Sequence, residues 1–553
     1  MTGSPEIQVQ TLNHLGIIAG IIDEMGLVEE INQQLGRHER EIVSAGHIVK
    51  AMILNGLGFV TSPLYLFEQF FEGKATEHLI GEGVLAKHLN DDRLGRVLDQ
   101  LYLADLTKLF VSIALKVAIK EGICVESLHL DSSSFHVHGE YLSNWEELSL
   151  VVAQGKDDLL APQTAPKPIH ITYGYSRDNR PDLKQFIIDL ICSADGDIPL
   201  YLRVADGNES DKAMFAQLIQ EFRQQLSLES LIVADSALYS EDNIKSLGSL
   251  KWICRVPLSV AAAKQIVKEL TIGDLIDTQL PGYRIACRHS EYGGIAQRWV
   301  IVESQARKQA DIKQLYRTIE QLEQRLNQQM SQLSHQNFRC EADARLAAER
   351  FAKKLKYHAL EGVTVTPQKQ HTRPGRPRKD SQPVVTYRLA ASLVRNPTAI
   401  QETIASSGRF ILATNVTNPQ DLSDFQVLQE YKQQQAPERG FRFLKDPLFF
   451  TSSICLKSPE RVAAMAMVMG LCLLVYSLGQ RQLRQALVAT RESLKDQLGK
   501  ATQSPTLRWI FQCFQDVHLF QAAGVKHIAN LTSERRWILG FFGRRVRQYY
   551  LLC

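Results

Sequence analysis

The chain has 553 residues, of which 44% are hydrophobic and 22% are charged, and 63 Lys and Arg against 60 Asp and Glu leave a net charge of +3. This composition is typical of globular proteins, and the length corresponds to about three or four domains. The near balance of charges excludes a strongly basic protein, so charge alone does not establish a nucleic-acid partner.

Cysteines and apolar segments exclude further classes. The nine cysteines are scattered singly without a C-x-x-C pair, which excludes a zinc ribbon or redox motif and favours the reducing cytoplasm. The N-terminus lacks the pattern of a secretory signal. The apolar run Val462–Leu478 follows Ser458 as N-cap and Pro459 as first helical residue, which predicts a buried core helix, and we expect no membrane partner.

The N-terminal region, residues 1–120, is predicted to be helical. Apolar residues recur at helical spacing in Leu12–Leu35, Ala45–Leu57 and Leu94–Val117, with turn signals at Gly58 and Ser62-Pro63. We expect these residues to form an all-α domain.

Residues 121–257 are predicted to form an α/β unit. Short β-prone segments occupy Cys124–Leu130, two stretches that begin at Phe186 and Leu200, and residues 231–234. The amphipathic stretch Lys212–Gln225 has the length of a crossover helix.

Residues 258–400 are predicted to form a separate insertion. Strands are expected at Tyr283–Cys287, Arg298–Val302 and Val384–Ala390. The apolar seam of residues 304–336 predicts a helical hairpin or short coiled coil, with a dimer interface as the alternative. The Pro-rich, basic residues 361–385 are expected to form a loop or a disordered arm.

The remaining chain divides at residue 480. Residues 401–480 begin with a strand at Arg409–Thr414, after which helices are expected to continue through residues 481–553 to the end.

Two segments share one local pattern: an apolar strand followed by Asp and Ser. They are HLDSSS (129–134), which contains Asp131, and IVADSA (232–237), which contains Asp235. A single Asp after a strand is usually a turn former or N-cap. If the two strands are neighbours, however, both carboxylates project from one edge of the sheet and repel each other unless a cation lies between them. Oxygen ligands of this kind suit Mg²⁺ or Mn²⁺.

A third carboxylate is offered by the segment LQEYKQQQAPERGFRFLKDPLFF, residues 428–450. Tyr431, Glu438 and Lys445 are spaced seven apart, which would place them on one face of a continuous helix. Pro437 would kink or restart that helix, and a restart would leave Glu438 at a helix N-terminus, where the dipole favours carboxylate and phosphate.

This spacing resembles the Y-R-E-K signature of insertion-sequence transposases of the IS four superfamily. Four further segments carry the resemblance and point to the branch numbered sixteen thirty-four: GYSRDNRPDLKQF (174–186), VADGNESD (204–211), IVADSALYSEDN (232–243) and PERGFRFLKDP (437–447). The N-terminal stretch QVQTLNHLGIIAGIIDEMG agrees with the same branch. One residue departs from the signature, because Gln434 stands where the signature has Arg, which puts a phosphate contact by that Arg in doubt.

The resemblance implies an α/β fold with an RNase H-like catalytic domain, formed by residues 121–257 and 401–480 around a β-rich and helical insertion. It implies that Asp131, Asp235 and Glu438 are the catalytic residues and hold two Mg²⁺ or Mn²⁺ ions for DNA cleavage and strand transfer. We expect Tyr431, Arg442 and Lys445 to contact DNA. The resemblance also implies that the all-α N-terminal domain, residues 1–120, binds the DNA ends, and that the protein associates with the nucleoid.

The implied partners are double-stranded DNA, namely the terminal inverted repeats of the transposon and the target, and a second copy of the chain in a synaptic complex. Arg376 and Arg378 lie in RPGRPRK, which resembles a minor-groove-binding motif and is alternatively a solvated loop. Two rival functions remain at this stage: an RNase H-like nuclease that cuts without joining, and a transposase-derived DNA-binding protein.

Overall fold

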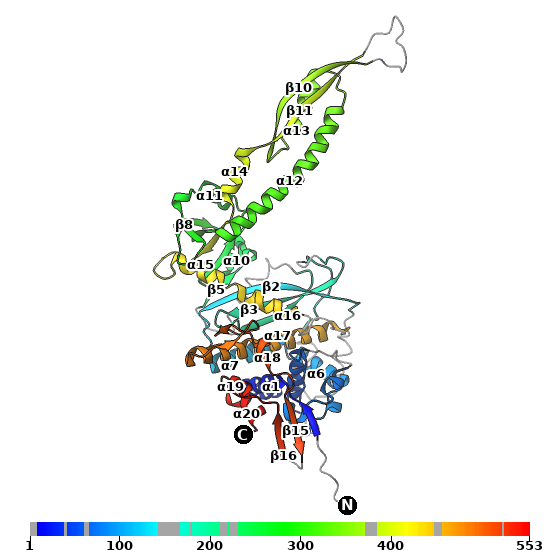
Figure 1. Cartoon of the computed structure of the whole chain (residues 1–553), viewed down its shortest axis with the longest axis vertical. Coiled ribbons are helices and arrows are strands. Elements are labelled where there is room, and N and C mark those ends of the chain that lie inside the picture. The colour runs from blue at the N-terminus through cyan, green and yellow to red at the C-terminus, as the bar shows by residue number, and fades with distance from the viewer. Residues whose placement is uncertain are drawn as a thin grey trace, which may run out of the picture. The chain divides into compact units, whose positions relative to one another are not determined.

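The chain folds into two compact units (Figure 1). The computed structural model describes residues 8–37, 41–59, 66–141, 166–176, 180–209, 219, 230–370, 384–446, 456–522 and 525–552. The first unit combines residues 1–254 with 429–553, and the second consists of residues 255–428. Both ends of the chain therefore belong to the first unit, and the second unit is inserted between its two parts.

Helices dominate the N-terminal part of the first unit, as predicted. They are α1 (Leu15–Met25), α2 (Leu27–Leu35), α3 (Ala45–Gly56), α4 (Phe67–Phe71), α5 (Thr76–Ile80), α6 (Asp91–Leu103) and α7 (Leu106–Lys120). Two predicted helical spans are each divided: Gly26 adopts a left-handed conformation after α1, and the Asp105 side chain caps α7. Strand β1 (Gln8–Thr11) adds to the predicted pattern.

A mixed sheet forms the centre of the first unit. Its strands are β2 (Ser127–Val137), β3 (Lys184–Ser193), β4 (Pro199–Ala205), β5 (Leu231–Ala234) and β6 (Trp252–Val256), in the order β4-β3-β2-β5-β6. β2 pairs with β3 antiparallel and with β5 parallel. The 3-10 turn η3 (Ser236–Leu238) and α10 (Glu241–Leu247) follow β5. The predicted crossover helix Lys212–Gln225 lies almost wholly outside the described residues.

One long apolar helix, α17 (Pro459–Thr490), forms the core beside this sheet. The side chain of Ser458 caps it and Pro459 begins it, as predicted. By length and composition α17 could cross a membrane, but 94% of its apolar window is buried inside the protein. It packs against β4 and the helices α1, α3, α6 and α7, which confirms the predicted core helix.

The C-terminal region is helical, with short strands that the sequence did not indicate. Its helices are α18 (Leu507–Cys513), α19 (Ser533–Leu539) and α20 (Arg544–Leu551), and its strands are β13 (Leu494–Lys495), β14 (Ala501–Thr502), β15 (His518–Ala522) and β16 (Val525–Ala529). The sheet order β1-β15-β16 joins this region to the N-terminal residues. These strands are too short to show an alternating pattern, so their pairing depends on the tertiary structure.

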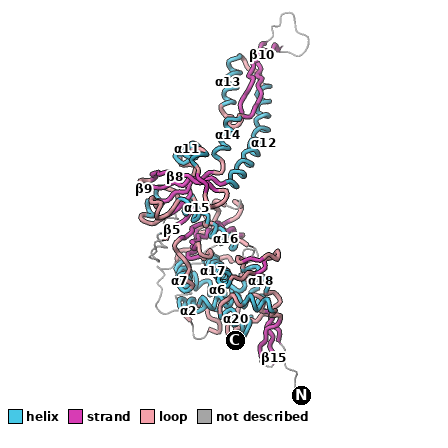
Figure 2. Tube along the Cα trace, turned by 60° about the vertical axis from the view of Figure 1, so that its left-hand side comes forward, coloured by secondary structure: helices cyan, strands magenta, loops and turns pink. Residues whose placement is uncertain are grey.

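The second unit combines antiparallel strands with helices (Figure 2). Its elements are α11 (Ala261–Glu269), η4 (Ile272–Asp274), β7 (Ile276–Asp277), β8 (Tyr283–Tyr292), β9 (Ile295–Ser304), α12 (Gln305–His335), α13 (Glu341–Ala352), β10 (His358–Gln370), β11 (Val384–Arg395), α14 (Pro397–Ser406), β12 (Arg409–Thr414) and, at the unit boundary, α15 (Asp424–Lys432). Within this unit the strands of the sheet pair in the order β12-β9-β8-β7. The predicted α/β fold class, with a mixed sheet and an insertion between the two parts of the first unit, is confirmed.

Two expectations for the insertion are corrected. Within residues 304–336 there is one uninterrupted helix, α12 (Gln305–His335), and its apolar seam packs within the chain, with Leu315 and Ile319 against Tyr357 and Ile400. Part of the expected loop, residues 361–370, belongs to strand β10, which pairs with β11. Cross-strand pairing thus orders a segment whose own sequence lacks periodicity, while residues 371–383 lie outside the described part.

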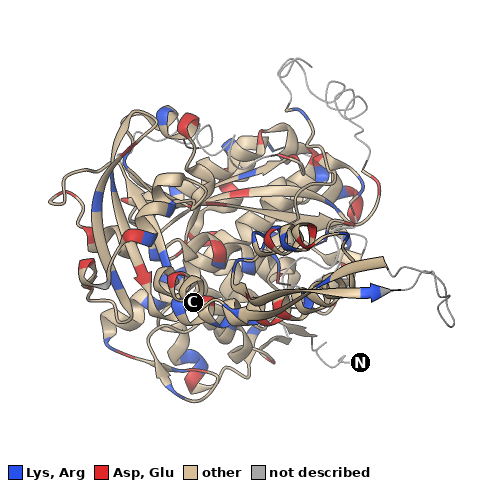
Figure 3. Cartoon of the chain, turned by 90° about the horizontal axis from the view of Figure 1, so that it is seen from above, with Lys and Arg blue, Asp and Glu red and all other residues tan. Residues whose placement is uncertain are grey.

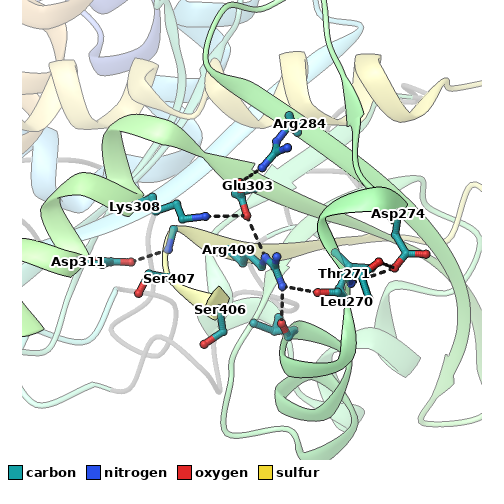
Figure 4. Close-up of polar contacts among 12 residues, drawn as sticks. Leu270, Thr271, Asp274, Arg284, Glu303, Lys308, Asp311, Ser406, Ser407 and Arg409 are labelled. Carbon is teal, nitrogen blue, oxygen red and sulfur yellow. Dashed lines mark hydrogen bonds and ion pairs between the residues drawn. The ribbon is translucent and has the colours of Figure 1, made fainter. Parts of the chain in front are cut away.

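A buried carboxylate ties the elements of the second unit together (Figure 4). Glu303 of β9 is 5% exposed and forms ion pairs with Arg284 of β8, with Arg409 of β12 at 3.0 Å and with Lys308 of α12 at 3.5 Å. Burial by itself would raise the pKa of Glu303, but the hydrogen bonds from both arginines and the charge of Lys308 outweigh it and hold the pKa below its ordinary value. Glu303 therefore stays charged and fixes three neighbouring elements.

Close packing of α1 against α20 gives a test of the first unit. A Cβ at Gly20 would lie 2.4 Å from Val546 Cα. We expect Gly20→Ala to lower the free energy of unfolding by about 2 kcal/mol or more, although alanine normally favours a helix interior. Thermal melting should show the loss, whereas Gly95→Ala, which meets only the side chain of Arg461, should melt close to wild type. A Gly20→Ala protein as stable as wild type would contradict this packing.

The buried histidine before α1 predicts sensitivity to acid. His14 is 2% exposed, and burial lowers its pKa to about 4, despite a hydrogen bond to the Leu57 carbonyl. Because this pKa lies below that of the unfolded chain, the stabilising contribution is complete above about pH 6.5 and is lost toward pH 4, at about 1.4 kcal/mol per pH unit.

We expect urea unfolding of wild type to shift to lower denaturant between pH 7 and pH 5. The His14→Phe protein keeps a ring to stack on Phe511 but cannot titrate, so its decline should be smaller. Equal declines in both proteins would show that His14 does not contribute.

Candidate active site

The two predicted aspartates stand side by side on neighbouring strands. In the parallel pairing of β2 with β5, Leu130 is opposite Ala234, so the following residues, Asp131 and Asp235, lie at the same level. Adjacent strands are about 4.8 Å apart. Both side chains are half-buried, so they are open to solvent yet anchored in the sheet. The condition set for the two carboxylates, that their strands are neighbours in one sheet, is therefore met.

The surroundings of each aspartate differ from the expected strand end. β2 does not end before Asp131 but continues to Val137, because β3 pairs with it along this whole length. β5 does end at Ala234, and Asp235 then occupies the N-cap position of η3 without making a side-chain cap. The Asp235 carboxylate is therefore not used as a cap, which was its main structural alternative.

Helix α16 (Gln435–Leu444) covers the face of the sheet on which Asp131 lies (Figure 1). Leu190 of β3 is paired with Asp131, and paired residues of antiparallel strands share a face. A Cβ at Gly440 of α16 would lie 3.5 Å from Leu190 Cδ1. The helix that carries Glu438 therefore packs over the strand that carries Asp131.

Contacts at both ends determine the direction of α16 along β2. Just before its start, the Gln434 side chain donates to the Leu130 carbonyl at 2.7 Å. Toward its end, the Phe441 ring lies 6.4 Å from that of Phe135, and Lys445 Nζ is 5.4 Å from the Phe135 ring centroid. α16 thus follows β2 in the direction of the strand, past the level of Asp131.

Glu438 lies in the first turn of α16 and is exposed. The alternative of one continuous helix through Tyr431 and Lys445 is wrong, because α15 ends at Lys432 and α16 begins anew at Gln435. Pro437 explains the restart. Proline has no backbone N–H, and backbone N–H groups lack a partner within the helix only in the first turn, so Pro437 fits the first turn of α16. The helix dipole there favours the carboxylate of Glu438.

The donor set fits a divalent cation. Three carboxylates offer the hard oxygen ligands that Mg²⁺ and Mn²⁺ take in proteins. Within the described ranges, no three His, Cys, Asp or Glu side chains converge closely enough to enclose a metal ion. Mg²⁺ is commonly held by one or two carboxylates together with substrate phosphates, so the adjacent aspartates suit a site that DNA completes.

The predicted DNA contacts have different surroundings. Arg442 of α16 is exposed, whereas Lys445, directly after the helix, is half-buried over an aromatic ring, and Tyr431 of α15 is half-buried. Arg376 and Arg378 lie outside the described residues. Over the described ribbon, basic and acidic residues are interspersed rather than separated (Figure 3).

The two thiols next to the aspartates are not reactive groups. Cys192 and Cys254 lie on the strands beside β2 and β5 and are buried. Burial, and then the negative charges of nearby carboxylates that include Asp131 and Asp235 respectively, raise the pKa of each thiol. Both thiols therefore stay neutral, and a neutral thiol is a poor nucleophile and a poor metal ligand.

Sequence reasoning missed two groups that support the site. On the other face of β2, Ser132 donates to Asp189, which also binds Arg203 at 3.2 Å. On α16, Arg439 forms a bidentate ion pair with Asp197 at 2.6 and 2.7 Å. Arg439 lies in one of the segments that carry the family resemblance. Its role in holding the helix, however, depends on Asp197, which lies far away in sequence.

A histidine in the same segment has a structural role. His129 is 0% exposed and contacts the side chains of Gln434 and Ser127. Burial lowers its pKa to about 4, although the bond to Gln434 opposes the shift. His129 is therefore neutral near pH 7, and its contact with Gln434 joins β2 to the start of α16.

Comparison with known families agrees with this arrangement. Residues 128–476, which include the three carboxylates, match the model of the transposase DDE domain. The chain belongs to that family. Its members are phosphoryl-transfer enzymes that move DNA and generally use divalent metals. Residues 7–115 match a domain of unknown function, DUF4277.

Other comparisons are more distant. No curated protein matches the chain in sequence. Among solved structures, the piggyBac transposase in a synaptic complex with hairpin DNA is 9% identical, with a TM-score of 0.37 over 98% of this chain and 84% of that one.

Repulsion between the paired aspartates predicts how a neutral substitution affects stability. Without divalent metal, we expect Asp235→Asn to melt at the wild-type temperature or slightly above it, because one of two adjacent negative charges is removed. Differential scanning calorimetry in EDTA measures the melting temperature, and Asp242→Asn, which changes an exposed residue, is the control. A melting temperature several degrees below that of wild type would show that Asp235 serves the fold instead.

Proposed function

We propose that this DDE transposase mobilises an insertion sequence by a cut-and-paste reaction, as a member of the IS four superfamily and its branch sixteen thirty-four. One observation carries the proposal. Asp131 and Asp235 lie at the same level on the neighbouring strands β2 and β5, and α16, the helix that carries Glu438, packs over β2. The motifs between and after these residues support the assignment to the branch. Its substrates are the terminal inverted repeats and the target DNA.

In the proposed reaction, Asp131, Asp235 and Glu438 are the catalytic residues. They hold two Mg²⁺ or Mn²⁺ ions, which when bound activate the attacking hydroxyl and stabilise the leaving oxygen. The strands fix the two aspartates at one level, so a scissile phosphate is received at a preformed pair of carboxylates. Because water and a sugar hydroxyl can occupy the same position, one site serves both hydrolysis and joining.

Cationic and aromatic side chains around α16 bind and orient the DNA. Arg442 is exposed one turn after Glu438 and pairs with a backbone phosphate. Lys445 adds a second positive charge beside the sheet, and Tyr431 contacts the backbone or a displaced base. Arg376 and Arg378 contact the minor groove. Two copies of the chain hold the two transposon ends together during the reaction.

Cleavage of a supercoiled plasmid that carries the inverted repeats flanking the coding sequence tests this proposal. In Mg²⁺ the wild type should cut at the repeat ends and join them to target DNA. Glu438→Gln should lower the cleavage rate by about 100-fold or more, since it removes one carboxylate ligand. It should leave DNA affinity unchanged, and Glu492→Gln, an exposed control in the same unit, should cleave normally.

Three outcomes would overturn the proposal in different ways. Equal cleavage by Glu438→Gln and wild type would remove Glu438 from the site. Cleavage without joining would identify a nuclease. Binding of the repeats without cleavage by any variant would identify a DNA-binding protein derived from a transposase.

A further inference from the structure

Gln434 occupies the signature position of an arginine, yet it lies inside the protein. Gln434 is 7% exposed and directly precedes α16. Its Nε2 donates to the carbonyl of Leu130, the residue before Asp131, at 2.7 Å, and its Oε1 lies 3.3 Å from His129 Nδ1. Both ends of the amide are therefore bound to β2 and turned away from solvent.

The hydrogen bonds fix the orientation of this amide. Because Nε2 donates to the carbonyl, Oε1 of Gln434 must accept, and His129 Nδ1 must carry the proton. His129 Nε2 then has a lone pair, and it lies 3.4 Å from Ser127 Oγ, which donates to it. Ser127, His129 and Gln434 are each less than 10% exposed. A buried chain of bonds of this kind admits one position of α16 on β2, because any shift leaves several polar groups without partners.

This position sets the level of Glu438 relative to Asp131. From Gln434 to Glu438 the helix advances by about 6 Å, and from His129 to Asp131 the strand advances by about 6.6 Å. The helix and the strand run in the same direction, as the contact of Phe441 with Phe135 shows farther along. The hydrogen bond at His129 therefore sets the carboxylate of the helix at the level of that of the strand.

We propose that Gln434 is a positioning residue for the active site, which holds α16 so that Glu438 stands near the level of Asp131 and Asp235 along β2. Gln434 thus has a different role from an arginine at this position, which would be expected to contact phosphate. The inference rests on the proposed function, in which these three residues are catalytic. It predicts that loss of the Gln434 bonds weakens metal use without weakening DNA binding.

Gln434→Met tests the proposal, because methionine has a similar length but forms neither hydrogen bond. Gln185→Met is the matched control: Gln185 is 2% exposed, lies on β3 of the same unit, and donates to the Gly207 carbonyl at 2.7 Å. Three quantities are compared in the full chain: hydrogen exchange of residues 435–445, affinity for the repeat DNA in EDTA, and the Mn²⁺ concentration that gives half-maximal cleavage.

For Gln434→Met we expect faster exchange in residues 435–445 and a half-maximal Mn²⁺ concentration about 10-fold higher or more, the size of effect seen when a residue behind a metal ligand is removed. DNA affinity should stay within about threefold of wild type, since no charge is lost. Gln185→Met should melt earlier but keep the wild-type Mn²⁺ dependence and the wild-type exchange of α16.

Two results would overturn the proposal. Unchanged exchange in residues 435–445 would show that Gln434 does not hold α16. Weaker DNA binding by Gln434→Met together with tighter binding by Gln434→Arg would instead assign the position to a phosphate contact. If the wild type fails to cut DNA, the proposed function fails, but hydrogen exchange still decides whether Gln434 holds the helix.

Discussion

The parallel pairing of β2 with β5 is the constraint on which the site depends. It places Asp131 and Asp235 at one level, about one strand spacing apart, in a position where two negative charges repel. Such a pair persists because the backbone hydrogen bonds of the sheet hold the strands regardless of what the side chains prefer. A sheet can therefore maintain two unfavourably close carboxylates until a cation and a phosphate reach them.

The rest of the first unit serves to hold α16 against this sheet. Gln434 joins the start of α16 to β2, and Arg439 joins its middle to Asp197 in the turn between β3 and β4. The buried helix α17 packs on α16 and on β4. The third carboxylate comes from a segment about 200 residues after the second aspartate, so these tertiary contacts supply what proximity in sequence cannot.

Mild overall charge is compatible with action on DNA. Acidic and basic residues are interspersed in the chain, and its net charge is +3. Local arrangement therefore matters more than total charge. In the proposed function, the exposed Arg442 near Glu438 would pair with a phosphate, and the carboxylates would need metal to accept that phosphate beside them. The adjacent aspartates alone do not enclose an ion, which suits an enzyme that assembles its metal site on the substrate.

The sequence by itself determined the elements and the chemistry that depend on local pattern. Strand periodicity predicted the two Asp-bearing strands, an N-cap and a proline predicted the start of α17, and the restart of a helix near Pro437 was one of two stated alternatives. Each of these follows from neighbouring residues, because side-chain alternation, capping and the missing N–H of proline act within a few positions. The same local patterns carried the resemblance to transposases.

Only the tertiary structure decided how these pieces meet. The level of Asp131 with Asp235, the strand β10 in a segment without periodicity, and the buried bonds of Gln434 and His129 all depend on partners far away in sequence. Hydrogen bonding between strands and the need to satisfy buried polar groups act through space, so a residue's neighbours along the chain do not reveal them. For Gln434, the signature indicated only that a phosphate contact by arginine is missing, whereas the structure shows a buried hydrogen bond to β2.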